Sequence, residues 1–382
     1  MIENTMMKRC FALVLGAILC LCGCRGGAPS SFEGPVALFS AGEEGYNTFR
    51  IPAIIRTPEG ALLAFCEARK NSHKDHGDID LVLKRSEDGG VTWSEMSPIW
   101  NDGENCCSSP TPVVLDNGRI LLLCTWKTTA VPFHYFDIHW FQFYSDDDGR
   151  TWNGPRLISE GLVEKDWIMA CVGPGHAIQL QNGPHKGRVI ASCYHKWEGE
   201  GKLWQGRSFF IYSDDRGESW TRGAFSQRGG NECMSAELSN GDIMLNMREF
   251  KRWADTTRLE RRRQVAISTD GGETLSDIVF DPQLLDPICE GSILRYRHGH
   301  ERQDWILFMG PMDEQVRKDL KVKLSKDRGQ NWTEIYDAPY NREAYSDMAE
   351  LPDGSVALLY EAGDSTSRDC IAFDLLPKKS IR

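Results

Sequence analysis

Three arginines stand at the ends of apolar segments that have the pattern of β-strands. Arg50 directly precedes such a segment, Arg248 directly follows one, and Arg317 lies shortly before a third. Each guanidinium offers a planar fork of N–H donors that matches a carboxylate. A single arginine of this kind is usually a surface residue, but three that converge would form a strong carboxylate site. The spacing therefore raises the hypothesis of a pocket for a ligand that carries a carboxylate.

The elements that would position these arginines are marked by a signature that recurs five times. Its consensus is S-x-D-x-G-x-T/S-W, with three close copies and two looser ones. Successive copies begin about 55 to 68 residues apart, and a nearly constant period of this length indicates a repeated supersecondary unit. The aspartate can accept backbone N–H groups of its own turn, and the glycine can adopt a positive φ. We therefore expect these aspartates to stiffen a hairpin rather than to catalyse. The copies begin at Ser86, Ser145, Ser213, Ser268 and Ser325.

Short apolar runs alternate with turn signals along the rest of the chain. Asn117-Gly118 and Asp353-Gly354 each separate two such runs, which is a strong hairpin signal. No long segment with helical periodicity competes. About four strands fit into each period, and four-stranded units arranged radially are propeller blades. The sequence thus predicts an all-β fold, a six-bladed β-propeller with four-stranded antiparallel blades. Residues 36–40 are expected to pair into the last blade near residues 355–360 and so close the ring.

The composition is that of a packed globular protein with an acidic balance. The chain has 382 residues, 41% of them hydrophobic and 10% aromatic, with a formal charge of −11 at pH 7. Because nucleic-acid binders need a basic face for the phosphates, this charge argues against a general nucleic-acid partner. None of the cysteines after Cys24 forms a C-x-x-C pair, so neither a zinc site nor a thioredoxin-type site is indicated. We expect mostly buried thiols, with a disulfide as the alternative.

The N-terminal residues have the pattern of a targeting segment. Lys8 and Arg9 precede an apolar run over residues 11–22 that is too short to span a bilayer. The run ends in Leu21-Cys22-Gly23-Cys24, which resembles a bacterial lipoprotein box with Cys24 as the lipidated residue. We expect an exported lipoprotein anchored to a membrane, at the cell surface or facing the periplasm, with a secreted protein as the alternative. The expected segments are a signal peptide over residues 1–24, a flexible tether over 25–34 and a propeller domain over 35–382.

One short motif and the repeated signature together resemble the sialidase (neuraminidase) family of bacterial and mammalian enzymes. The motif is Phe49-Arg50-Ile51-Pro52, and the resemblance extends over residues 45–361. The signature alone also occurs in unrelated propellers, so the two are specific only in combination. In this family three arginines hold the carboxylate of sialic acid, a further arginine lines the sugar, and a glutamate fixes the first arginine. The resemblance therefore assigns substrate binding to Arg50, Arg69, Arg248, Arg317 and Glu361, with Arg317 in the weakest local motif.

The resemblance also implies three catalytic residues. Tyr345 matches the nucleophile, and Glu232 matches the glutamate that activates it. Asp75 lies in the polar run before Ile79 and matches the acid/base residue. Asp78 is the alternative to Asp75, and Glu237 is the weaker alternative to Glu232.

The chemistry explains why a tyrosine is needed. Sialic acid carries a carboxylate on its anomeric carbon, so a carboxylate nucleophile would be repelled by it. A phenol is neutral until it loses its proton, and its pKa of about 10 requires a base such as Glu232. Sialidases are the glycosidases in which tyrosine takes this role. Asp75 would protonate the leaving oxygen and then activate water, which gives retention of configuration. The arginines are expected to lower the pKa of Tyr345 by favouring its anion.

The resemblance as a whole implies an exo-α-sialidase that removes terminal α-linked sialic acid from glycoproteins, glycolipids or oligosaccharides. One alternative is a relative that acts on deaminated sialic acid or releases an anhydro product. Another is a non-catalytic propeller that binds sialic acid with the same arginines. No cofactor and no catalytic metal are expected, and a structural calcium ion is left open.

Two other clusters have simpler interpretations. Arg258 and residues 261–263 form a basic cluster that is expected to be a solvated hairpin. An aromatic-rich stretch over residues 126–140 either lines the acetamido or aglycone side of the site or belongs to the core.

Overall fold

The computed structural model describes residues 32, 34–130, 137–199, 204–250, 260–301 and 303–382. These belong to one compact unit, Phe32–Arg382. The described part contains twenty-five strands and one short 3-10 helix, η3 (Lys378–Ser380), so the prediction of an all-β fold is confirmed. No helix in this part is long and apolar enough to cross a membrane. Cys24, the signal segment and nearly all of the expected tether lie outside the described residues.

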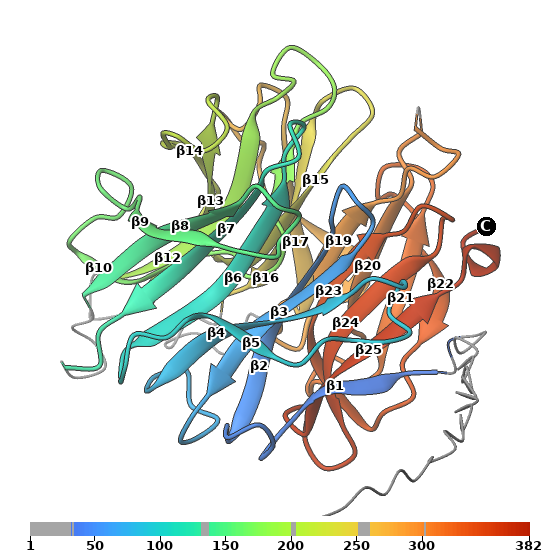
Figure 1. Cartoon of the computed structure of the whole chain (residues 1–382). Coiled ribbons are helices and arrows are strands. Elements are labelled where there is room, and N and C mark those ends of the chain that lie inside the picture. Colours follow the sequence, from blue (N-terminus) through green and yellow to red (C-terminus); the bar gives the residue numbers. More distant parts are fainter. Residues whose placement is uncertain (1–31, 33, 131–136, 200–203, 251–259, 302) are drawn as a thin grey trace, which may run out of the picture. The chain divides into compact units, whose positions relative to one another are not determined.

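Hydrogen bonding divides the strands into five sheets (Figure 1). One has the order β1-β25-β24-β23, from β1 (Val36–Ser40), β23 (Arg342–Glu350), β24 (Val356–Gly363) and β25 (Cys370–Leu376). A second has the order β10-β12-β13-β14 with β11 on β12, from β10 (Trp167–Val172), β11 (Ile178–Gln179), β12 (Val189–Glu198), β13 (Trp204–Ser213) and β14 (Thr221–Phe225). A third runs β15 (Gly230–Glu237), β16 (Ile243–Glu249), β17 (Arg262–Ser268) and β18 (Val279–Leu285). A fourth runs β19 (Ser292–Arg295), β20 (Ile306–Pro311), β21 (Leu320–Ser325) and β22 (Thr333–Asp337).

The fifth sheet has eight strands, and it shows that the prediction of six separate four-stranded blades was wrong. Four sheets are separate blades of four or five strands, but the residues expected to form two further blades lie in one hydrogen-bonded sheet. The connection is a parallel bridge between Ile79 and Cys106, where the Ile79 N–H also donates to the Asn105 carbonyl at 3.2 Å. The eight strands are β2 (Thr48–Arg56), β3 (Leu62–Arg69), β4 (Ile79–Ser86), β5 (Ser97–Trp100), β6 (Cys106–Val114), β7 (Ile120–Lys127), β8 (Ile138–Ser145) and β9 (Asn153–Leu157).

The inner strands of these sheets close into a ring. Strand β2 contacts β6 on one side and β23 on the other, β6 contacts β10 and β11, and β15 contacts β12 and β19. Strand β19 contacts β23, which completes the ring. The first strand, β1, joins the sheet of β23 and β24 as predicted, but its direct partner is β25, with Val36 opposite Phe373. The N-terminal strand therefore occupies the outer edge of the last sheet and covers an edge that would otherwise be open.

Each copy of the repeated signature forms the turn between two consecutive, paired strands, which are β4 and β5 for the first copy. In the first copy Asp88 Oδ1 accepts the backbone N–H of Thr92 at 2.8 Å, and Asp88 Oδ2 accepts the Thr92 hydroxyl at 2.6 Å. Ser86 Oγ accepts the N–H of Gly90 at 2.8 Å. The backbone N–H bond to the aspartate recurs in the other four copies, which confirms the structural role predicted for these aspartates. The aspartates are Asp88, Asp147, Asp215, Asp270 and Asp327.

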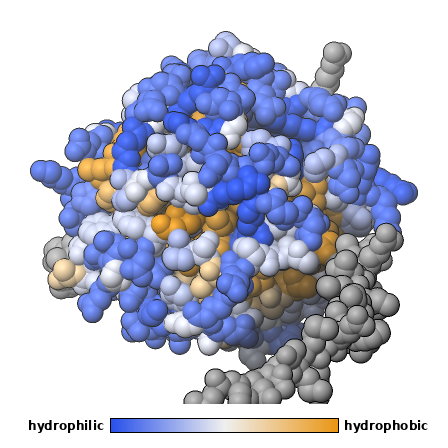
Figure 2. Space-filling model, viewed as in Figure 1, coloured by the Kyte–Doolittle hydropathy of each residue, from blue (hydrophilic) through white to orange (hydrophobic). Residues whose placement is uncertain are grey.

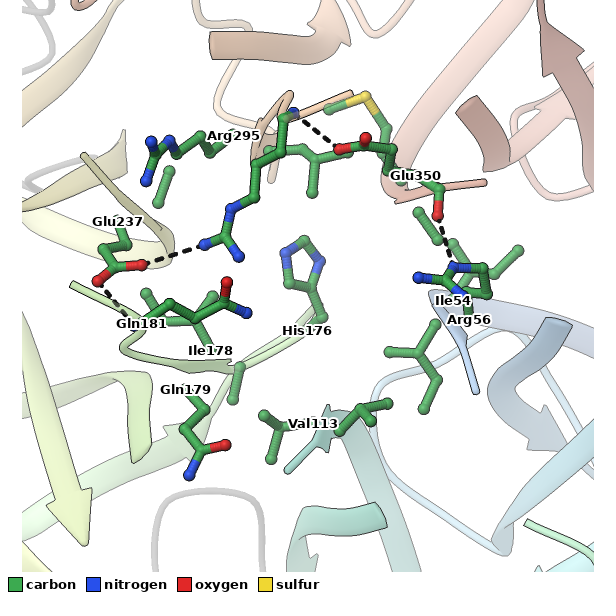
Figure 3. A pocket seen from close by; sticks show the side chains of 18 of the residues that line it. Ile54, Arg56, Val113, His176, Ile178, Gln179, Gln181, Glu237, Arg295 and Glu350 are labelled. Carbon is green, nitrogen blue, oxygen red and sulfur yellow. Dashed lines mark hydrogen bonds and ion pairs between the residues drawn. The ribbon is translucent and has the colours of Figure 1, made fainter. Parts of the chain in front are cut away.

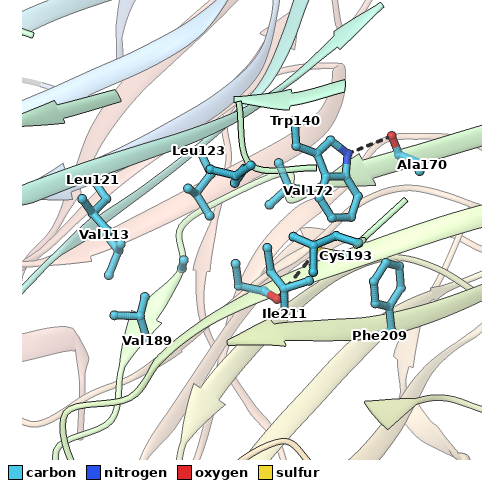
Figure 4. Packing of buried hydrophobic residues seen from close by; sticks show 14 of the residues in the cluster. Val113, Leu121, Leu123, Trp140, Ala170, Val172, Val189, Cys193, Phe209 and Ile211 are labelled. Atoms are coloured by element: carbon cyan, nitrogen blue, oxygen red, sulfur yellow. Dashed lines mark hydrogen bonds between the residues drawn. The ribbon is translucent and has the colours of Figure 1, made fainter. Parts of the chain in front are cut away.

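The core lies between the faces of neighbouring sheets. Figure 4 shows one cluster in which Leu121 and Leu123 of β7 pack near Ile211 of β13. Trp140 is fully buried there, and its indole N–H donates to the Ala170 carbonyl at 3.3 Å. Charged and polar side chains cover most of the face seen in Figure 2, with small apolar patches between them. All nine described cysteines are buried free thiols.

Gly90 shows how closely the signature hairpins pack against the next sheet. Its φ is +96°, and a Cβ atom added there would lie 2.2 Å from the Phe373 ring. Gly90→Ala is therefore expected to destabilise the protein by about 2–3 kcal/mol, through strain at positive φ and through overpacking. Urea unfolding measures the change. Gly89→Ala is the matched control, because Gly89 also has a positive φ but no atom within 4 Å of the added Cβ. Equal destabilisation by both variants would contradict the role of the Phe373 contact.

Candidate active site

Three of the predicted site residues lie near the start of inner strands, where the strand pairing is irregular. The register of β2 with β3 shifts between Arg50 and Ala53, and that of β23 with β24 shifts between Glu343 and Ser346. Strand β15 has the same kind of shift beside Glu232, between Gly230 and Cys233. Such β-bulges re-aim side chains next to functional sites. The shifts thus turn Arg50, Glu232 and Tyr345 out of the regular alternation of their strands.

Arg50 is held by a buried carboxylate. Its Nε donates to Glu361 Oε1 at 2.9 Å, and a terminal nitrogen donates to Glu361 Oε2 at 3.1 Å, which is a bidentate pair. The backbone N–H of Ile51 donates to the same Oε1 at 3.0 Å. Ile51 has a φ of +58°, a strained conformation for a β-branched residue. Glu361 therefore fixes both the side chain and the backbone at the start of the Phe49–Pro52 motif.

Removal of this carboxylate charge should be costly. Glu361 is completely buried and Arg50 almost so, and breaking a buried pair leaves an uncompensated charge. Glu361→Gln is expected to lower the free energy of unfolding by about 3 kcal/mol, as measured by urea denaturation. Glu314→Gln removes the half-exposed partner of Arg262 and should cost less than about 1 kcal/mol. Similar losses in the two variants would be inconsistent with a buried, bidentate Arg50–Glu361 pair.

Tyr345 and Glu232 form the centre of the site. The Tyr345 hydroxyl lies 2.6 Å from Glu232 Oε1 and 2.8 Å from Oε2, and Tyr345 is only 5% exposed. A terminal nitrogen of Arg248 donates to the Tyr345 oxygen at 2.9 Å and also forms a very short contact with Glu232. The phenol is thus placed between a base that can take its proton and a cation that can stabilise its anion.

The other two arginines lie over the Tyr345 ring. The guanidinium carbon of Arg50 is 4.9 Å from the ring centroid, and that of Arg317 is 5.3 Å from it. Arg317 is oriented by a hydrogen bond of 2.7 Å to the Ile288 carbonyl. The structure therefore brings Arg50, Arg248 and Arg317 together around one phenol, as the hypothesis of a carboxylate site requires.

Asp75 lies at the open side of this cluster. Its side chain is 72% exposed, and its Oδ1 accepts from Arg69 at 2.7 Å and from Arg50 at 3.1 Å. Arg69 is buried and is held by Glu67, two residues earlier on the same face of β3, at 2.6 Å. Loss of hydration opposes ionisation of Asp75, but the charges of Arg69 and Arg50 outweigh it and lower its pKa. Without ligand, Asp75 is a carboxylate.

The pKa of Tyr345 is set by opposing contributions. Burial, followed by the charge of Glu232, raises the pKa of Tyr345 well above its ordinary value, although the three arginines act in the opposite direction. The arginines thus act on this pKa in the predicted direction, but burial and the charge of Glu232 outweigh them in the protein without ligand. For Glu232 burial acts to raise the pKa, but the charge of Arg248 and the Tyr345 hydrogen bond prevail and lower it. The pair is thus a neutral phenol bonded to a carboxylate.

The alternatives to Asp75 and Glu232 lie elsewhere. Asp78 has no described contact with an arginine; burial and the charge of Asp80 raise its pKa. Glu237 lies in a different pocket, where it accepts from the Gln181 N–H at 2.8 Å and from Arg297 at 3.1 Å (Figure 3). That pocket is lined by the last residues of the inner strands, whereas Glu232 is near the start of β15. The geometry therefore favours Asp75 and Glu232.

Two lysines belong to the site and were missed by the sequence analysis. Lys127, at the end of β7, is buried and donates to the Asp75 carbonyl at 3.3 Å. Lys196 is close enough to the site that burial and the charge of Arg248 lower its pKa. Neither lies in a recognisable motif. The contact of Glu67 with Arg69 could have been predicted, because residues two apart on a strand share a face.

The basic cluster and the aromatic-rich stretch agree only in part with their predicted roles. Arg263, which was expected on a solvated hairpin, is buried and donates to Asn246 Oδ1 and the Cys289 carbonyl, each at 2.7 Å, so that prediction was wrong for this residue. Arg258 lies outside the described residues, as do residues 131–136 of the aromatic stretch. Trp140 of that stretch is in the core.

Among the described residues no group of three or more His, Cys, Asp or Glu side chains is arranged to hold a metal ion.

Comparison with known proteins gives the family. The model of the BNR repeat-like domain matches residues 51–358. A sialidase from Micromonospora viridifaciens is 29% identical over 361 residues, which cover 88% of this chain and 53% of that protein. The chain belongs to the sialidase family of glycoside hydrolases. An exo-alpha-sialidase from Arthroderma benhamiae is 27% identical and is aligned over 86% of this chain and 82% of its own length.

Solved structures of sialidases are similar over most of the chain. A Hadza microbial sialidase, Hz136, superposes with a TM-score of 0.75 at 25% identity, covering 91% of this chain and 69% of that one. The chain thus spans about half the length of the Micromonospora sialidase but most of the Arthroderma exo-alpha-sialidase.

Proposed function

We propose that this sialidase-family protein is an exo-α-sialidase that hydrolyses terminal α-linked sialic acid from glycoconjugates with retention of configuration. The observation that carries the proposal is the Tyr345–Glu232 hydrogen bond inside a cluster of three arginines. This chemistry needs a nucleophile within hydrogen-bond reach of its base, and it needs both groups to face a cationic pocket.

In the first step the arginines bind the substrate carboxylate, and the Tyr345 oxygen attacks the anomeric carbon. The phenol proton passes to Glu232, a transfer across the 2.6 Å hydrogen bond. The bond from the anomeric carbon to the glycosidic oxygen breaks, and that oxygen takes a proton from Asp75. The arginines then face a carboxylate next to a ring that is becoming cationic, and they keep it paired throughout.

Substrate binding would prepare Asp75 for its role as an acid. In the protein without ligand, Asp75 accepts hydrogen bonds from Arg50 and Arg69 and is ionised. A substrate carboxylate on Arg50 would take over part of that positive charge and add a negative one nearby. Both changes raise the pKa of Asp75, so that it gains the proton it must later donate. In the second step its carboxylate activates the water that hydrolyses the tyrosyl intermediate, and Glu232 returns the proton to Tyr345.

The direct test is hydrolysis of a fluorogenic aryl α-sialoside, with the products followed by NMR. Release of α-sialic acid as the first product is expected. Tight binding of sialic acid without turnover would instead favour a non-catalytic binding protein. Release of an anhydro sugar, or preference for the deaminated substrate, would place the chain with relatives of different specificity.

We also propose that the protein is exported and anchored to a membrane through a lipid on Cys24, from the lipoprotein-like motif that ends there. Cys24→Ser expressed in a bacterial host should move the activity from the membrane fraction to the soluble exported fraction, whereas Cys22→Ser should leave it in the membrane fraction. Unchanged fractionation of Cys24→Ser would overturn the anchor.

A further inference from the structure

A second pocket, of about 360 Å³, opens at one end of the sheet that contains β10–β14. Three aromatic rings and two guanidinium groups line it together with His195. None of these residues takes part in the proposed reaction. The residues used below are Trp167, His195, Trp197, Arg207, Arg222 and Phe225.

The pocket has a rigid aromatic floor. Trp167 of β10 and Trp197 of β12 are paired across the strands. The His195 ring centroid lies 3.9 Å from that of Trp167 and 5.0 Å from that of Trp197. The Phe225 ring centroid lies 5.4 Å from that of His195. Both indoles are only partly buried. Because the rings hold one another in place, a ligand that stacks on the indoles would find a surface that is already ordered.

The charges of the lining cancel. Arg222 pairs with Glu164 at 2.6 Å and Arg207 lies over the Trp197 ring, while Asp166 supplies a second carboxylate. Burial and the nearby arginines lower the pKa of His195 to about 3, so its ring is neutral. Two guanidinium groups of the lining therefore face two carboxylates, unlike the arginine cluster around Tyr345. Beside the lining, the guanidinium carbon of Arg228 lies 5.8 Å from the Trp197 ring centroid. This balance favours an uncharged ligand.

The pocket also offers unused hydrogen-bonding capacity. Arg207 Nε is buried and has no hydrogen-bond partner among the described residues, and neither ring nitrogen of His195 has one. Buried polar atoms without partners cost free energy until a ligand or water satisfies them. Hydroxyl groups act as both donors and acceptors, which suits a guanidinium, carboxylates and a neutral imidazole together.

The position of the pocket relates it to the candidate active site. Trp167 is the first residue of β10, just as Arg50 and Glu232 lie near the start of β2 and β15. Lys196, whose pKa responds to Arg248, follows His195 on β12 and so points to the opposite face of that strand. The two sites thus lie at the same end of the Phe32–Arg382 unit, on either side of one strand.

We propose that this pocket binds a neutral pyranose ring of a glycan, with the apolar face of the sugar on the indoles of Trp167 and Trp197 and its hydroxyls on the surrounding polar groups. A sugar ring has both an apolar face and a rim of uncharged hydroxyls, which is what the lining offers. The inference goes beyond the proposed hydrolysis, because binding here requires neither sialic acid nor turnover.

The test is titration of the full chain with three uncharged sugars, lactose, methyl α-mannoside and N-acetylglucosamine, followed by saturation-transfer NMR. Saturable binding of at least one is expected, and Trp197→Ala should weaken it at least about fivefold. Trp305→Ala is the matched control, since Trp305 is also half-buried and stacked on a histidine, His300 at 3.6 Å, but directly precedes β20 of another sheet. Arg207→Ala should weaken binding as well and tests the pocket without removal of an indole.

Circular dichroism should show that Trp197→Ala and Arg207→Ala are folded, and hydrolysis of a small aryl α-sialoside should be unchanged in both. No binding of any of the three sugars, or binding that neither variant weakens, would overturn the inference. Because lactose carries no sialic acid, an inactive enzyme could still bind it here. Failure of the proposed hydrolysis and failure of this pocket are therefore distinguished.

Discussion

Tyr345→Phe is expected to lower kcat for hydrolysis of a fluorogenic aryl α-sialoside by at least about a thousandfold, because the change removes the attacking oxygen. The ring itself should keep its place, since it packs in a small buried cluster with Ile51, Cys289 and Ala344. Arg50 and Arg317 also lie over the ring rather than on the hydroxyl. Binding of a carboxylate inhibitor should therefore survive, so the loss should appear in kcat.

The matched control for this variant is Tyr296→Phe. Tyr296 is buried to a similar degree, and its hydroxyl donates to the Gly354 carbonyl at 2.8 Å, outside the candidate active site. Its loss should cost about 1 kcal/mol of stability and leave kcat unchanged. Full activity of Tyr345→Phe would contradict the mechanism. Weak residual hydrolysis that gives the inverted product would instead mean that water attacks directly, with Glu232 as its base.

The features predicted well from the sequence were those whose contacts are local. In each signature the aspartate bonds to residues within the same hairpin, as Asp88 does to Thr92. The residue types and their spacing therefore contain most of the interaction. The number of blades, by contrast, depends on contacts between residues of different units. It depends on whether Ile79 pairs with Cys106 across two units, and no pattern in either segment indicates such a bridge.

The site was predictable only through family resemblance. Arg50 and Glu361 are separated by 311 positions in the chain, and no periodicity connects them. Burial was the property that sequence reasoning treated least well. Burial outweighs the lowering effect of the arginines on the pKa of Tyr345, and Arg263 of the basic cluster is buried inside the protein. Neither result was expected, because the types of neighbouring residues were known but the loss of water around them was not.

Asp75→Asn should have an effect that depends on the leaving group. A glycosidic oxygen attached to another sugar needs a proton to leave, whereas an aryl oxygen leaves readily without one. For sialyllactose, loss of the general acid is expected to lower kcat/KM by about 10²- to 10⁴-fold. For an aryl sialoside the first step should remain fast, but hydrolysis of the tyrosyl intermediate loses its base. The expected result is a burst of fluorophore equal to the enzyme concentration, followed by slow turnover.

Asp78→Asn is the matched control, because Asp78 lies three residues further along the same loop and has no described contact with an arginine. This variant should hydrolyse both substrates at nearly the same rate as the unchanged protein. Asp75, by contrast, touches both Arg50 and Arg69, so its replacement by an uncharged amide should also weaken the hold on those arginines. That effect would lower activity equally for both substrates and would produce no burst. An equal loss without a burst would therefore reduce Asp75 to a positioning residue, and a burst in Asp78→Asn would transfer the acid/base role to Asp78.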